Sequence, residues 1–349
     1  IFYVFINIGG VIAPFVAPLL REWWLKAHDM LYNAQLPALC HQFQETGELN
    51  DKLILLASDS SLQPVNDMAT FCSDYLQIFN EGIHYSFIAS VTAMLISLTI
   101  FIATRKRFPT PAKKAAATNV DYTPEERMAA AKEIKQRMYA LFAVLAIAIF
   151  FWFAFHQNGT SRSLFARDFV QSDSVAPEVW QALYPFYVII LTPVVMWVFG
   201  ALGRRGIYIS TPRKIAIGMA IAGTAYVFLA AYSYFMGYPS ATEARAEGVV
   251  LSGPWVLLVL YFFLTVAELF ISPLGLSFVS KVAPKHMLGL CQGLWLGATA
   301  VGNLLLWIGP LIYNAAPIWV CWTVFLAVCL ISMGIMLGMV KWLEKVTNA

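Results

Sequence analysis

The chain of 349 residues is 59% hydrophobic and only 12% charged, with a mean hydropathy of +0.67 and a net charge of +3. Soluble domains carry about 25% charged residues, so this composition excludes an ordinary soluble protein and indicates a polytopic membrane protein. The basic residues gather in a few loops and act as topology signals, so no nucleic-acid partner is predicted.

Eight apolar stretches are each long enough to cross about 30 Å of hydrocarbon. The first already begins at Ile1, without an initiator Met, a charged leader or a cleavage site. We therefore expect no signal peptide, and we expect that an upstream part of a longer chain is absent. The predicted spans of this all-α membrane protein are 1–20, 84–104, 138–158, 181–202, 214–236, 251–273, 288–312 and 317–342.

The basic residues predict the orientation of the chain. If the spans alternate, four segments share one side and hold 17 of the 23 Lys and Arg residues. Because cytoplasmic loops carry the excess of Lys and Arg, this side is predicted to be cytoplasmic. The four segments are 105–137, 203–214, 281–287 and 341–349.

The segment 21–83 is a long insert on the opposite side, with nine acidic against three basic residues. Periodic runs such as "DKLILLAS" predict some helix within it. Cys40 and Cys72 both lie there, on the oxidising side of the membrane, which favours a disulfide. Two free thiols remain an alternative, because the sequence gives no Cα distance. The remaining cysteines, Cys291, Cys321 and Cys329, are predicted to be small hydrophobic residues within spans.

The cytoplasmic segment 105–137 divides the chain into two spans before it and six after it. Its stretch "TPEERMAAAKEIKQRMYA" begins with Thr123 as a cap and Pro124 at the first helical position. We expect a helix along the cytoplasmic surface that runs into the next span. The layout is typical of the major facilitator superfamily: 1–104 would be the last two helices of an N-terminal bundle, and 138–349 a six-helix C-terminal bundle.

Glu268 is an acid in the middle of the apolar stretch "LYFFLTVAELFISPLGLSFVSKVAPKHMLG". A carboxylate at that depth costs about 2.5–3.5 kcal/mol on insertion scales, and such residues usually mark substrate or proton routes. Ser272, Pro273 and Gly275 are expected to loosen the helix just after it, where released backbone can line a cavity.

Three further polar or aromatic features lie within predicted spans. Asn7 in "FYVFINIGG" suits either a helix contact or a binding role. His156 in "FWFAFHQNGTS" lies near the outer end of its span and could titrate near neutral pH. Trp152 and Trp295 lie deeper than an interfacial belt, and both core packing and a pocket remain open for them.

These stretches resemble the proton-dependent oligopeptide transporter family, also called the peptide transporter family, in its fifth, seventh and tenth-to-eleventh helices. The resemblance implies two six-helix bundles, alternating access and uptake of di- and tripeptides with the proton as coupling ion and no cofactor. It also implies that Glu268 contacts the peptide amino terminus and that both Glu268 and His156 serve proton coupling or gating. The implied substrate-binding residues are Glu268, Asn7, Trp152, Trp295, Tyr184 and Ser272.

Two departures from the family pattern keep other functions open. His156 stands where the family usually has glutamate, and Tyr184 stands where it has asparagine before proline. A family member that carries nitrate or another non-peptide solute is therefore an alternative, as is a non-transporting membrane sensor. An enzyme is not predicted, because His156 and Glu268 lie at different depths and no zinc-type spacing occurs. If the source is bacterial, we expect the inner membrane.

Overall fold

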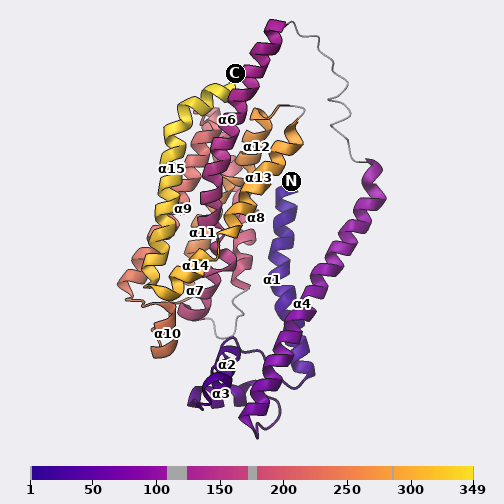
Figure 1. The fold of residues 1–349 in the computed structure, drawn as a ribbon, viewed down its shortest axis with the longest axis vertical. Coiled ribbons are helices and arrows are strands. Elements are labelled where there is room, and N and C mark those ends of the chain that lie inside the picture. Colours follow the sequence, from indigo (N-terminus) through magenta and orange to yellow (C-terminus); the bar gives the residue numbers. More distant parts are fainter. Residues whose placement is uncertain (1, 108–123, 172–178, 285–286, 349) are drawn as a thin grey trace. The chain divides into compact units, whose positions relative to one another are not determined.

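The computed structural model describes residues 2–107, 124–171, 179–284 and 287–348. Within these ranges the regular elements are helices, joined by turns and loops with two isolated β-bridges (Figure 1). Eight helical segments among the described residues are long and apolar enough to cross a membrane, which confirms the predicted number of spans. They are Phe5–Ala27, Met68–Arg107, Ala131–Phe155, Val179–Arg204, Thr211–Phe235, Trp255–Val282, Leu288–Ala315 and Ile318–Val346.

The chain forms two compact units. Unit 1 comprises Ile1–Ile8, Thr110–Gln171 and Leu183–Ala349, and unit 2 comprises Gly9–Pro109 and Ser172–Ala182. Each unit has its own buried residues and its own helix contacts, so the two are described separately below.

Unit 2 is built from most of α1 (Phe2–Ala27) together with α2 (Leu36–Thr46), α3 (Asp51–Ser60) and α4 (Met68–Thr104). Side-chain caps fix where two of these helices begin: Asn50 accepts the Lys52 N–H at the start of α3, and Asp67 accepts two N–H groups at the start of α4. Gly47 ends α2 with φ +69°, a conformation that glycine adopts without strain. The helix expected within 21–83 is thus confirmed, although α1 and α4 extend further into this segment than predicted.

A buried cluster joins the ends of these helices in unit 2. Its members are Leu25, Met30, Leu36, Cys40, Leu53, Ala57, Phe71, Cys72 and Tyr75. An antiparallel bridge between Met30 and Ser61 joins the residues after α1 to the end of α3. Apolar burial of this kind, from four separate segments, gives the insert a hydrophobic core of its own.

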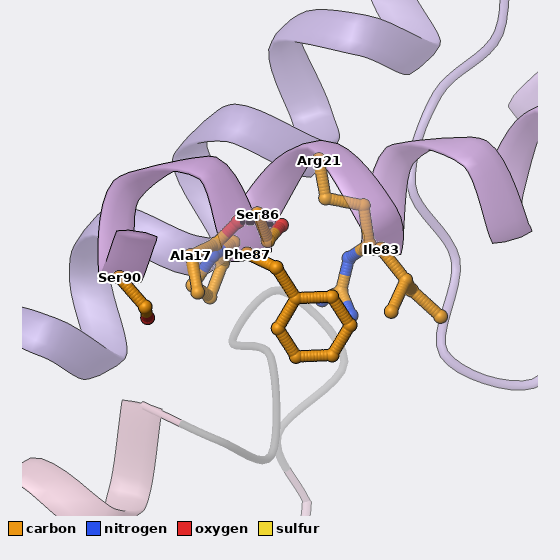
Figure 2. Close-up of a pocket in the computed structure, with 7 residues that line it drawn as sticks. Ala17, Arg21, Ile83, Ser86, Phe87 and Ser90 are labelled. Atoms are coloured by element: carbon orange, nitrogen blue, oxygen red, sulfur yellow. Dashed lines mark hydrogen bonds between the residues drawn. The ribbon is translucent and has the colours of Figure 1, made fainter. Parts of the chain in front are cut away.

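A cavity of about 220 Å³ lies between α1 and α4 within unit 2 (Figure 2). Its lining residues are Ala17, Pro18, Arg21, Ile83, Ser86, Phe87 and Ser90. The Arg21 guanidinium lies 4.3 Å from the centre of the Tyr32 ring, and the Ser86 hydroxyl donates to the Ala17 carbonyl at 2.8 Å. None of the predicted site residues lines this cavity, so it is separate from the site built below.

The helices of unit 1 begin with α6, a continuous helix of 32 residues over Pro124–Phe155. The predicted linker helix therefore extends the spanning helix directly and does not form a separate surface helix. Thr123, the predicted cap, lies outside the described residues. The other helices are α7 (Ser161–Phe169), α8 (Leu183–Arg204), α9 (Thr211–Phe235), α10 (Ala241–Glu247), α11 (Trp255–Leu269), α12 (Ser272–Val282), α13 (Leu288–Leu304), α14 (Ile308–Ala315) and α15 (Ile318–Asn348).

Unit 1 packs as a helical bundle in which α9 contacts α11, α12 and α15, and α6 contacts α13 and α15. Small residues let helix backbones approach closely where the contacts are tightest. A Cβ at Gly218 of α9 would lie 2.9 Å from the Ala267 carbonyl oxygen, and one at Gly302 of α13 would lie 2.7 Å from the Ile149 carbonyl oxygen. Such small-residue contacts are typical of helix packing in membranes.

Two of the predicted spans are interrupted. The span around Glu268 breaks between α11 and α12, and the next breaks between α13 and α14. The first break was expected from Ser272, Pro273 and Gly275, because Pro273 cannot donate the backbone hydrogen bond that a continuous helix would need. The sequence analysis did not predict the second break.

Candidate functional site

Glu268 lies in the last turn of α11, directly before the break, and is only 6% exposed. The backbone remains hydrogen-bonded through the break: Phe270 donates to the Ala267 carbonyl, and Ile271 donates to the Glu268 carbonyl at 2.8 Å. The Ser272 hydroxyl then donates to Glu268 Oε1 at 3.0 Å. This hydrogen bond holds one carboxylate oxygen in place directly before α12.

Trp295 of α13 lies against the first turn of α12. Its six-membered ring occupies the space where a Cβ at Gly275 would be, so glycine is required for this contact. Because Gly275 and Ser272 lie about one turn apart on α12, the break beside Glu268 and the Trp295 indole belong to one local arrangement. Trp295 is 4% exposed.

Trp152 of α6 packs against Trp295. The two indoles meet edge to face, with ring centroids 6.5 Å apart and an angle of 81° between their planes. His156 stacks on Trp152 at 4.6 Å, and its Nδ1 lies 2.7 Å from Oδ1 of Asn303, near the end of α13. Since an amide oxygen only accepts, the Nδ1 atom carries the proton and Nε2 is left to exchange one.

Tyr184 and Asn7 are placed less directly. Tyr184 of α8 has its ring centroid 6.2 Å from that of Phe155, which in turn contacts Trp152 edge to face. Asn7 lies in the part of α1 that belongs to unit 1 and is 6% exposed. The structure thus brings Glu268 into contact with Ser272, and Trp152 into contact with both Trp295 and His156. The binding and proton-coupling roles of all these residues, as of Asn7 and Tyr184, stay predictions.

The sequence analysis missed two residues at this site. Asn303 is a polar residue near the end of a glycine-rich helix, and nothing in the sequence pairs it with His156, which lies 147 positions earlier. Arg162 carries a charge and is nevertheless only 1% exposed. Its guanidinium donates to the Phe155 carbonyl and lies 5.7 Å from the Tyr261 ring centre, so it caps the C-terminal end of α6.

The glycines of α13 differ in their surroundings. They are Gly289, Gly293, Gly297 and Gly302. Gly302 faces the backbone of α6 closely. A Cβ at any of the other three would have no atom within 4 Å among the described residues.

The sequence profile of the POT family matches residues 113–314, which is more than half of the chain, so the protein belongs to this family of transporters. It is 27% identical over 321 residues to dipeptide and tripeptide permease B of Aeromonas hydrophila, a match that covers 87% of this chain and 57% of the relative. Over 174 residues it is 33% identical to the peptide transporter YePEPT of Yersinia enterocolitica, covering 49% of this chain and 32% of that protein. The chain thus spans little more than half the length of the Aeromonas permease.

The fold is similar to solved POT transporters. A crystal structure of a peptide transporter POT in complex with sulfate aligns with a TM-score of 0.56 at 18% identity, covering 99% of this chain and 86% of the other. The POT family transporter PepTSo aligns with a TM-score of 0.54 at 17% identity, over 98% of this chain and 89% of that one. These likenesses show the fold, and the described residues contain eight candidate membrane spans.

Proposed function

We propose that the protein containing this chain is a proton-coupled symporter that takes up di- and tripeptides by alternating access. Membership of the POT family supports a transport role, and relatives bearing the names of dipeptide and tripeptide permeases support the substrate class. The observation that carries the proposal is the buried Glu268, held by Ser272 at a helix break whose next turn packs on Trp295.

Glu268 is proposed to bind the peptide ammonium. A buried carboxylate gains most from a cationic partner, because its alternatives are an unpaired charge or protonation. The Ser272 hydroxyl holds one carboxylate oxygen, which fixes the orientation of the group. Trp152, Trp295 and Tyr184 would supply apolar and aromatic surface for peptide side chains, and Asn7 an amide for the peptide backbone.

His156 is proposed to exchange the coupling proton together with Glu268. Its Nδ1 hydrogen is directed to Asn303, so a proton would be gained and lost at Nε2. This assigns proton handling to an imidazole that stacks on Trp152, a residue of the proposed substrate site.

For the whole protein we propose the arrangement that the charge pattern favours. Residues 1–104 are the last two helices of the N-terminal bundle, 105–137 the cytoplasmic linker and 138–349 the C-terminal bundle. The insert 21–83 faces outward from a bacterial inner membrane. The clustering of Lys and Arg on the opposite side supports this orientation.

A second candidate function is transport of nitrate or another non-peptide solute. It is favoured by His156 in place of an acid, since a protonated imidazole attracts an anion. A third is a membrane sensor that binds a ligand without transporting it, with the acidic insert as a binding surface.

The test is uptake by the complete protein reconstituted in liposomes, with a Glu268→Gln variant and competition by Ala-Ala or acetyl-Ala-Ala. Removing the charge should weaken inhibition by Ala-Ala about tenfold to a hundredfold, since a hydrogen bond to a charged group contributes about 1.5–3 kcal/mol. Acetyl-Ala-Ala has no ammonium and should inhibit both forms poorly.

The matched control is Glu45→Gln, which removes the same charge from an exposed residue of α2 in unit 2 and should leave inhibition unchanged. Equal inhibition of the Glu268→Gln and unmodified proteins by Ala-Ala would overturn the role of Glu268. Uptake of nitrate without peptide uptake would favour the second function, and peptide binding without uptake would favour a sensor.

A further inference from the structure

We propose that Cys40 and Cys72 form a structural disulfide that links α2 to the start of α4. The two thiols lie 32 positions apart in the chain, and both belong to the buried cluster of unit 2. Each is 0% exposed, and both are free thiols in the structure, on two helices that contact each other.

The position of Cys72 is fixed by Tyr75, which lies one turn further along the same face of α4. The Tyr75 hydroxyl donates to the Leu31 carbonyl and accepts the Asn33 backbone N–H, both at 3.1 Å. Residues 31–33 therefore lie against this face of α4, and Cys72 points to the same side.

The position of Cys40 is fixed by the start of α2. Asn33 holds the turn before this helix, because its Oδ1 accepts the N–H groups of Gln35 and Leu36 at 2.9 and 3.1 Å. Leu36 and Cys40 are four residues apart, on the same face of α2, and both are buried in the cluster. Asn33 thus connects Tyr75 on α4 to the start of α2, and this connection brings Cys40 to Cys72.

The reaction is an oxidation of both thiols. Two S–H bonds break, one S–S bond forms, and two electrons and two protons pass to the disulfide of a thiol–disulfide oxidant, which becomes a dithiol. Burial raises the pKa of the Cys40 thiol, so the folded thiol is protonated and unreactive. The bond therefore forms during folding, before the cluster closes.

The inference rests on the outward orientation proposed for the insert, because disulfides persist only in an oxidising compartment. Its test does not depend on peptide transport, and labelling of Lys52 reports the orientation separately. The protein contains its own controls: the thiols of Cys291, Cys321 and Cys329 lie in spanning helices and should stay reduced.

The experiment uses the complete protein, purified without reductant and alkylated in denaturant. Peptide mass spectrometry should show Cys40 linked to Cys72 and alkyl groups on the other three cysteines. Alkyl groups on both Cys40 and Cys72 would overturn the proposal. Labelling of the exposed Lys52 from outside the cell would show that a reversed orientation is not the cause of that result.

Cleavage by trypsin provides a second readout on the unmodified protein. Lys52 of α3 is exposed and lies between the two cysteines, so cleavage after it leaves the halves joined only by the disulfide. The two fragments should separate on a denaturing gel only after reduction. Fragments that separate without reductant would contradict the bond. In a Cys40→Ala and Cys72→Ala double variant they should separate in either condition.

Discussion

At the residue scale, the contact between His156 and Asn303 determines which ring nitrogen can exchange a proton. The amide oxygen of Asn303 takes the Nδ1 hydrogen at 2.7 Å, and the face of the ring is covered by Trp152. The orientation of the imidazole is therefore set by two residues from different helices.

An Asn303→Asp variant should move the pH dependence of uptake upward. A carboxylate at hydrogen-bonding distance stabilises the protonated imidazole, so His156 loses its proton at higher pH. Because Asn303 is exposed, solvent screening limits the shift to roughly half to one pH unit. The measurement is peptide uptake across a pH series, with Asn314→Asp as the control. A profile unchanged in Asn303→Asp would exclude His156 from proton coupling.

The buried charge of Arg162 is stabilised by the groups around it. Its guanidinium lies at the C-terminal end of α6, where carbonyl groups without helical partners carry partial negative charge. An Arg162→Leu variant should lower the melting temperature, because the Phe155 carbonyl loses its donor; a loss of about 1–3 kcal/mol is expected. Thermal unfolding in detergent measures this, and Arg204→Leu at the end of α8 is a control for general loss of charge.

At the scale of elements, the break between α11 and α12 is what creates the site. Ser272 and Pro273 interrupt the spanning helix, and the first turn of α12 then carries Gly275 against Trp295. In a continuous helix, the regular geometry of α11 alone would determine where Ser272 and Gly275 lie. The break lets α12 take its own direction and pack against α13.

Gly275→Ala should be more damaging than the same change at an open position. The added methyl group would overlap the Trp295 ring, and overpacking of this kind costs about 1–3 kcal/mol. Gly297→Ala of α13 is the matched control, since nothing lies within 4 Å of its Cβ position among the described residues. We expect a lower melting temperature and a shifted tryptophan fluorescence for the first variant only. Equal melting temperatures would show that Trp295 moves aside at no cost.

At the scale of the whole molecule, the charge distribution supports the proposed orientation. An amine-reactive reagent that does not cross membranes should label Lys52 of the insert on intact cells. It should label Lys106, beyond the end of α4, only after the membrane is permeabilised, because both lysines are exposed and the proposed orientation places them on opposite sides. Labelling of Lys106 alone on intact cells would reverse the proposed orientation.

The sequence by itself determined the eight spans, because apolar length needs no knowledge of neighbours, and it predicted the break at Ser272 and Pro273 from local backbone chemistry. It also singled out Glu268, since an acid within an apolar stretch is visible without a structure. Contacts between distant segments were decided only by the tertiary structure: Asn303 with His156, Gly302 against α6, and Cys40 and Cys72 in one buried cluster. The physical reason is that composition and spacing determine what a segment can bury, whereas its partner depends on how helices far apart in the chain pack together.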